Sequence, residues 1–252
     1  MNTSSNPGIG CWVDRLVSAT DRLVRWLKGS YFSETIELAE MEYEKDFQRL
    51  KTRGTKIMTE TDGWKVSSKS KENLKIETKS SELYNCTINR MTITIKVPVN
   101  VIRDTFTLLP GNRRKEWDTD VKEVIELKRF SDKKWLQITR SNGLGKGIIS
   151  PREFVDLCCL EEFDDGFLLT GGSIDYPEIQ SDDKYVRGFS GAYGFRVDKD
   201  PSKPGYSRLI SATEMDFKGK IPRALIDATI STVLVSSVAN WLKYLEKLGY
   251  QP

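Results

Sequence analysis

The chain contains 252 residues, of which 38% are hydrophobic and 30% charged, and its formal net charge is +3. This balance is typical of a globular protein, and it argues against both intrinsic disorder and a dedicated nucleic-acid binder. Histidine is absent, which excludes catalytic systems that depend on an imidazole and the usual zinc and haem ligands.

The first predicted element is an amphipathic helix over residues 11–29. Apolar side chains fall on one side of its helical wheel and charged ones on the other, and Gly29 can end it. Trp12 and Trp26 suit a membrane interface, and basic residues outnumber acidic ones, so we predict adsorption to anionic membrane surfaces. Two other interpretations stay open: a helix that packs on the folded domain, and a mitochondrial presequence.

A second helix is predicted over 33–52, with Ser33 as its N-cap. From Gly63 to Phe217 the pattern is mostly that of strands separated by turn signals, interrupted by one helical segment. The predicted strands cover 85–97, 121–130, 134–141, 154–163, 166–176, 184–197 and 206–217, and the helical interruption covers 99–109. So many consecutive strands predict one large antiparallel sheet that is strongly curved.

The last predicted element is a helix of about 27 residues, with Pro222 near its first position and Gly249 just after its end. Its N-terminal two-thirds are apolar or small on nearly all sides, which predicts that it is buried. We therefore expect an α+β chain in which the sheet wraps around this helix and leaves a cavity. The predicted division is a tail over 1–32 and one folded domain over 33–252.

Residues that carry chemistry are sparse. The four cysteines show no C-x-x-C spacing, which argues against a zinc site or a disulfide framework and fits a reducing compartment. Motifs for phosphate binding or a nucleophilic serine are absent, and the glycine clusters at 143–147 and 171–173 are typical of turns or bulges. No apolar run reaches the roughly 18 residues of a membrane span. We expect a binding protein without metal or cofactor, and not an enzyme.

Five ordered motifs resemble those of one known family. They are GWKV at 63–66, RKEWD at 114–118, IISPREFVDL at 148–157, YVRG at 185–188 and MDFKGKIPRALID at 215–227. Together they resemble the START family of lipid-transfer domains, and most of all its small soluble sterol-binding members. The resemblance implies a helix-grip fold, a curved antiparallel sheet around the C-terminal helix that encloses one lipid molecule.

The resemblance also implies candidate ligand contacts. In phosphatidylcholine-binding members, an arginine at the position of Arg114 meets the phosphate and an aspartate at the position of Asp118 steadies it. The tyrosine that helps to hold that headgroup aligns with Leu108, which weakens the phospholipid interpretation. The internal ion pair of the mitochondrial sterol-delivery members aligns with Thr139 and Cys158, so the pair is lost, although the Thr139 hydroxyl could meet a sterol hydroxyl.

Other polar side chains on the predicted strands are candidates for the cavity wall, although alternation alone does not say which faces point inward. They are Ser141, Thr170, Ser173, Arg187, Ser211 and Thr213. Trp117 is predicted to pack in the core. Arg152 is predicted to be structural, through a carboxylate or backbone carbonyls. The segment 173–184 is predicted to supply one gate of the cavity.

We predict an intracellular protein that carries one sterol-like molecule between membranes without making or breaking a bond. Phosphatidylcholine, a bile acid, a fatty acid or a carotenoid are alternative cargoes, and a lipid sensor that regulates a partner is an alternative role. We expect a cytoplasmic monomer that touches anionic membranes transiently, through the N-terminal helix and through Lys218, Lys220 and Arg223. No nucleic-acid partner is expected.

Overall fold

One ten-stranded sheet dominates residues 42–252, the part of the chain that the computed structural model describes. Its strands are β1 (Lys65–Val66), β2 (Leu74–Ser80), β3 (Thr87–Ile95), β4 (Val121–Ser131), β5 (Lys134–Ser141), β6 (Arg152–Phe163), β7 (Gly166–Ser173), β8 (Val186–Arg187), β9 (Phe189–Lys199) and β10 (Ser207–Asp216). They follow the order β1-β2-β3-β10-β9-β7-β6-β5-β4, and β8 pairs in parallel with β6 outside this path. The predicted helix over 11–29, with Trp12 and Trp26, lies outside the described residues.

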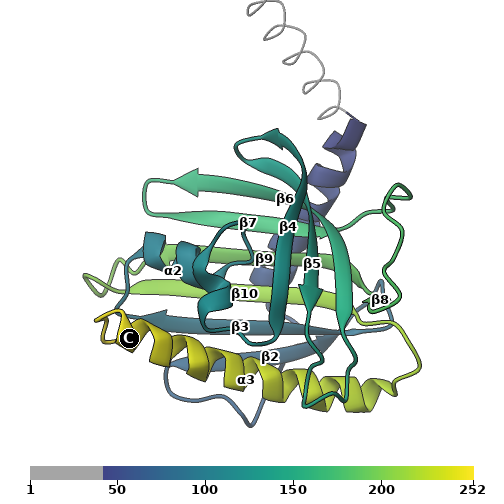
Figure 1. Cartoon of the computed structure of the whole chain (residues 1–252). Coiled ribbons are helices and arrows are strands. Elements are labelled where there is room, and N and C mark those ends of the chain that lie inside the picture. Colours follow the sequence, from purple (N-terminus) through teal and green to yellow (C-terminus); the bar gives the residue numbers. More distant parts are fainter. Residues whose placement is uncertain (1–41) are drawn as a thin grey trace, which may run out of the picture. The chain divides into compact units, whose positions relative to one another are not determined.

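The sheet bends sharply between its two halves. In Figure 1, β3, β10, β9 and β7 run nearly across the view, whereas β4, β5 and the first part of β6 run steeply down it. The pairing of β4 with β5 contains three register shifts, and such irregularities bend a strand and increase its twist. The predicted α+β helix-grip fold, with a curved antiparallel sheet and a long C-terminal helix, is confirmed.

Alternating side chains give the sheet two faces with different coverings. On β9, Phe195 belongs to the large core cluster that includes residues of α2 (Val99–Phe106) and α3 (Arg223–Lys247). On the opposite face, Ala192 packs with Ile57 and Met58 of a helix that covers residues 42–59. We call the face toward α2 and α3 the inner face and the other the outer face.

Glycines let the helix over 42–59 lie close to the outer face. A Cβ atom on Gly54 would stand 2.7 Å from the carbonyl oxygen of Tyr193, and one on Gly194 would stand 2.5 Å from the Met58 Cε atom. The same helix is tied to β10 by Arg53, whose guanidinium bonds the fully buried Glu214 carboxylate at 2.9 Å. Close packing and this ion pair together fix the helix on the sheet.

α3 begins and ends where its sequence indicates, but its burial differs from the prediction. Pro222 is its N-cap residue, and Gly249 follows it with a φ of +88°. Only five of its residues are buried, and four of them lie in its last three turns: Thr229, Val238, Trp241, Tyr244 and Leu245. The expectation that its N-terminal two-thirds are buried is wrong, because that part lies over a cavity.

By length and composition α3 could also cross a membrane, with a mean hydropathy of 1.4 over its most apolar window. Although the sequence contains no unbroken apolar run of about 18 residues, this helix is on average apolar enough for a membrane span. In this structure the C-terminal part of α3 belongs to the main core of the domain.

We expect Gly54→Ala to lower the melting temperature, although alanine favours a helix by about 1 kcal/mol over glycine. The added Cβ atom would press on the backbone of β9, and overpacking of this kind typically costs about 1–3 kcal/mol. Thr52→Ala, at an exposed position of the same helix, is the matched control and should not lower it. Thermal unfolding of both variants decides, and an unchanged or raised melting temperature for Gly54→Ala would contradict this packing.

Candidate functional site

A cavity lies between α3 and the inner face of the sheet. It contains about 1,160 Å³ of space free of protein atoms, including solvent at its mouth. Its wall is mainly apolar, with contributions from Met91, Phe106, Phe154, Phe195, Ile230 and Val238 among others. A concave, mostly apolar space with a few polar groups is the usual form of a small-molecule site.

Six of the polar residues predicted from the sequence line this cavity. They are Arg114, Asp118, Thr139, Ser141, Ser211 and Thr213. They come from the segment before β4, from β5 and from β10, which are far apart in the chain. Their contact with a ligand stays a prediction, and their placement makes it possible.

Arg114 and Asp118 form a close ion pair at the cavity wall. The Arg114 Nε atom donates to the Asp118 carboxylate at 2.7 Å, and another guanidinium nitrogen donates to the carbonyl of Phe106. The side chains of Arg114 and Asp118 are only 13% and 4% exposed. Trp117, between them in sequence, donates to the carbonyl of Thr105 at 2.7 Å and belongs to the core, as predicted.

Positions 139 and 158, where the sequence predicted the loss of an internal ion pair, carry neutral groups. Thr139 faces the cavity and accepts a hydrogen bond from the Gln137 amide at 3.2 Å. Cys158 lies on the inner face, where its Sγ atom is 3.0 Å from the hydroxyl of Tyr193. Burial raises the pKa of the Cys158 thiol and of the Tyr193 phenol well above their ordinary values, so both groups are neutral.

Two acidic residues of this wall were not singled out from the sequence, Asp120 and Asp156, and the more deeply buried of them is Asp156 on β6. It lines the cavity, is only 2% exposed, and accepts hydrogen bonds from the hydroxyls of Ser173 at 2.7 Å and Ser190 at 3.4 Å. Burial raises its pKa to about 7, and the two hydroxyls offset only part of that effect. A lone carboxylate inside the apolar run FVDLCC was the signal that could have singled it out.

Three of the predicted residues do not line the cavity. Thr170 lies on the outer face, where its methyl group would be 3.2 Å from a Cβ atom on Gly54. Arg187 donates to the fully buried Glu153 carboxylate at 2.8 Å. Ser173 is on the inner face, but its hydroxyl is used by the aspartate described above.

Arg152 fixes the chain between β10 and α3. Its buried guanidinium donates to the carbonyls of Phe217 at 2.6 Å, Lys218 at 3.2 Å and Ser150 at 2.6 Å. The predicted structural role through backbone carbonyls therefore fits, whereas within the described residues no carboxylate pairs with it. The neighbouring Glu153 bonds other arginines instead.

The loop between β5 and β6, residues 142–151, covers the start of α3. A Cβ atom on Gly145, which has a φ of +59°, would stand 2.3 Å from the Thr229 side chain of α3. Leu144 of this loop lines the cavity, whereas the segment 174–185 contributes no lining residue. The loop 142–151 therefore contributes to the mouth of the cavity, whereas a gating role for 173–184 stays a prediction.

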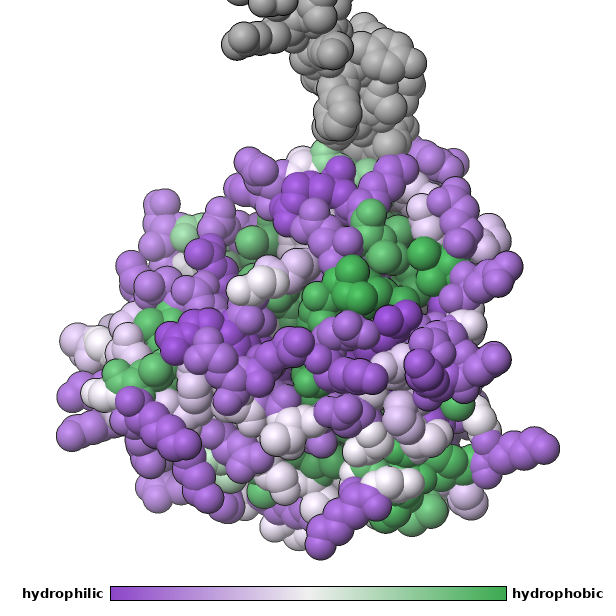
Figure 2. Space-filling view, viewed as in Figure 1, coloured by the Kyte–Doolittle hydropathy of each residue, from purple (hydrophilic) through white to green (hydrophobic). Residues whose placement is uncertain are grey.

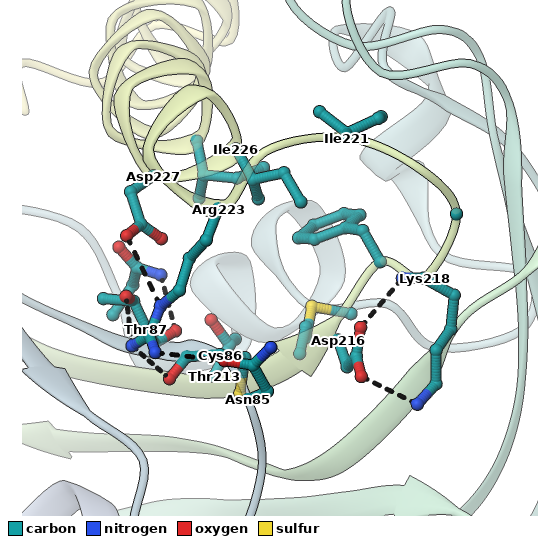
Figure 3. Close-up of a pocket in the computed structure, with 15 residues that line it drawn as sticks. Asn85, Cys86, Thr87, Thr213, Asp216, Lys218, Ile221, Arg223, Ile226 and Asp227 are labelled. Atoms are coloured by element: carbon teal, nitrogen blue, oxygen red, sulfur yellow. Dashed lines mark hydrogen bonds and ion pairs between the residues drawn. The ribbon is translucent and has the colours of Figure 1, made fainter.

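A second pocket adjoins the cavity at the N-terminus of α3 (Figure 3). The two share four lining residues, namely Thr213, Met215, Phe217 and Ile230. On the far wall of this pocket, Arg223 of α3 reaches the β2–β3 turn, where it donates to the Cys86 carbonyl at 2.9 Å and the Thr87 hydroxyl at 3.2 Å. Polar contacts therefore hold the start of α3 against the sheet.

The three basic residues predicted to touch membranes differ in how exposed they are and in whether they bind other parts of the protein. Arg223 is engaged with the β2–β3 turn as described. Lys218 is exposed and pairs with Asp216 at 2.7 Å, and Lys220 is exposed. Lys218 and Lys220 are therefore the basic side chains of this set that face solvent beside the second pocket.

We expect the stability of the Asp156→Asn variant, relative to the wild type at the same pH, to increase as the pH rises from about 5 to about 8. The folded-state pKa of about 7 lies above the ordinary value of 3.8, so the folded state binds more protons between these values. The wild-type carboxyl therefore supports folding below about pH 4, and that support is lost as the pH rises through about 7. Asparagine does not titrate. A melting-temperature difference between variant and wild type that is the same at both pH values would contradict the burial of this acid.

Comparisons with known proteins identify the family. The START domain model matches residues 51–250. Human StAR-related lipid transfer protein 4 is 28% identical over 186 residues, covering 74% of this chain and 88% of that protein. Human StAR-related lipid transfer protein 6 is 26% identical over 182 residues, covering 72% and 81%. The solved structure of human StAR-related lipid transfer protein 5 has the same fold, with a TM-score of 0.70 at 20% identity over 87% of this chain and 97% of that one. The chain belongs to the START family.

Proposed function

We propose that this protein is a carrier that holds one sterol-like lipid in the cavity beneath α3 and moves it between membranes through the cytosol. The observation that carries the proposal is the cavity itself, which is apolar, set between α3 and the inner face of the sheet, and provided with few polar groups. The relatives named above are called lipid transfer proteins, which supports a carrier and not an enzyme.

The character of the wall favours a sterol over a phospholipid. Leu108 lines the cavity where phosphatidylcholine-binding members have a tyrosine. The guanidinium of Arg114 already bonds Asp118 and a backbone carbonyl, so a phosphate would have to compete with a carboxylate for it. A rigid apolar lipid with one hydroxyl needs fewer polar partners in the cavity than a phospholipid with a zwitterionic headgroup.

The cargo can be identified by native mass spectrometry of the protein after incubation with liposomes that contain cholesterol and phosphatidylcholine. We expect one lipid per protein, with the mass of cholesterol, and displacement of any phosphatidylcholine retained from purification. Retention of phosphatidylcholine without competition by the sterol would contradict the sterol assignment but leave lipid binding intact. Absence of any bound lipid would contradict the carrier function itself.

Exchange with a membrane is proposed to take place at the rim formed by the 142–151 loop and the start of α3. Two large apolar side chains are exposed there, Ile148 at 48% and Leu225 at 43%. Figure 2 shows apolar surface in the region where Figure 1 places the start of α3 and the tip of this loop. The exposed Lys218 and Lys220 lie on the chain that leads into the same helix, and they would favour anionic lipids.

We expect Ile148→Asp to slow sterol transfer between anionic liposomes several-fold while the amount of sterol bound at equilibrium stays the same. The side chain is exposed, so its loss should weaken insertion into the membrane without disturbing the fold. Phe163→Asp, at the opposite end of β6 and 42% exposed, is the matched control and should transfer at the wild-type rate. Equal rates for all three proteins in a fluorescent-sterol transfer assay would remove this rim from the mechanism.

A further inference from the structure

Asp156 is a buried acid in the wall of the cavity, and the residues around it hold its carboxyl in place. The backbone N–H of Ser190 donates to the Ser173 hydroxyl oxygen at 2.8 Å, which leaves the Ser173 proton to donate to Asp156 at 2.7 Å. Ser173 is also the direct partner of Asp156 across the β6–β7 pairing. The carboxyl is thus anchored through a hydroxyl to the backbone of β9.

Within residues 42–252, Asp156 forms no ion pair and no hydrogen bond with a cation. The arginines that line the same cavity, Arg114 and Arg140, bond Asp118 and Glu123 instead. Tyr193, another titratable group of the wall, bonds a thiol. A carboxyl group offers about four acceptor sites, and the two serine hydroxyls use two of them. Acceptor capacity therefore remains on a group that lines the cavity.

We infer that Asp156 selects the cargo, by accepting a hydrogen bond from a hydroxyl at the inner end of the bound lipid. This inference rests on the proposed carrier function and names the class of ligand: a neutral lipid with one hydrogen-bond donor at its buried end. An ether or ester at that end has no donor to offer, and a carboxylate would be repelled by the ionised form of Asp156. The acceptor is present whether the carboxyl is protonated or ionised.

The test compares cholesterol with its 3-methyl ether, which keeps the ring system and removes only the donor. Each is offered in phosphatidylcholine liposomes, and the sterol bound by protein is measured after the liposomes are removed. Wild-type protein should favour cholesterol roughly tenfold or more, the range expected for one hydrogen bond to a buried carboxyl group. Asp156→Leu should bring the ratio close to one by lowering cholesterol binding alone.

The ratio of bound cholesterol to bound ether distinguishes a loss of selectivity from a loss of folded protein. A variant that is partly unfolded loses both ligands in the same proportion. Thr170→Val removes a hydroxyl from the outer face of β7, away from the cavity, and is the matched control, so its ratio should stay that of the wild type. An Asp156→Leu protein that still favours cholesterol tenfold would overturn the inference. So would a wild-type protein that binds the alcohol and the ether equally, although the carrier function would stand. A wild-type protein that takes up no lipid at all would instead refute the carrier function.

Discussion

α3 is packed into the main core of the domain at only one of its ends, and the cavity exists because of that asymmetry. Trp241 is fully buried, donates to the Thr105 hydroxyl at 2.9 Å, and lies with its ring centre 4.6 Å from that of Phe106. Tyr244 and Leu245 continue this packing toward the C-terminus. Beyond Val238 toward the N-terminus the helix no longer fills the space above the sheet, and that space is the candidate site.

The other end of α3 is held by polar contacts and by a smaller apolar cluster, in which Ile226, Ile230 and Val233 are only partly buried. Arg152 fixes the preceding chain through carbonyl groups, and Arg223 reaches the β2–β3 turn. Contacts of this sort can break locally without exposing the main core, so the start of α3 belongs among the elements that open at low cost. A carrier whose ligand is enclosed needs such an element.

The local structure could be predicted well from sequence patterns. The face of the sheet toward which each strand residue points could not. β5 runs over 134–141 as predicted, because strict alternation and turn residues are local signals. Which face points inward depends on pairing across the sheet, which one strand does not reveal. Thr139 and Ser141, two positions apart, share the cavity, whereas Thr170 and Ser173, three apart, fall on opposite faces. For the same reason Asp156 was not singled out from the sequence, because the serines that donate hydrogen bonds to it come from β7 and β9.

Amide hydrogen exchange along α3 tests most directly whether this helix closes a lipid cavity by its N-terminal half. Without lipid, residues 223–237 should exchange much faster than residues 238–247, which the Trp241 cluster protects. Loading with sterol should slow the first segment strongly and leave the second unchanged. Equal protection of both segments, unaffected by lipid, would contradict the account, because the whole helix would then be a fixed part of the core.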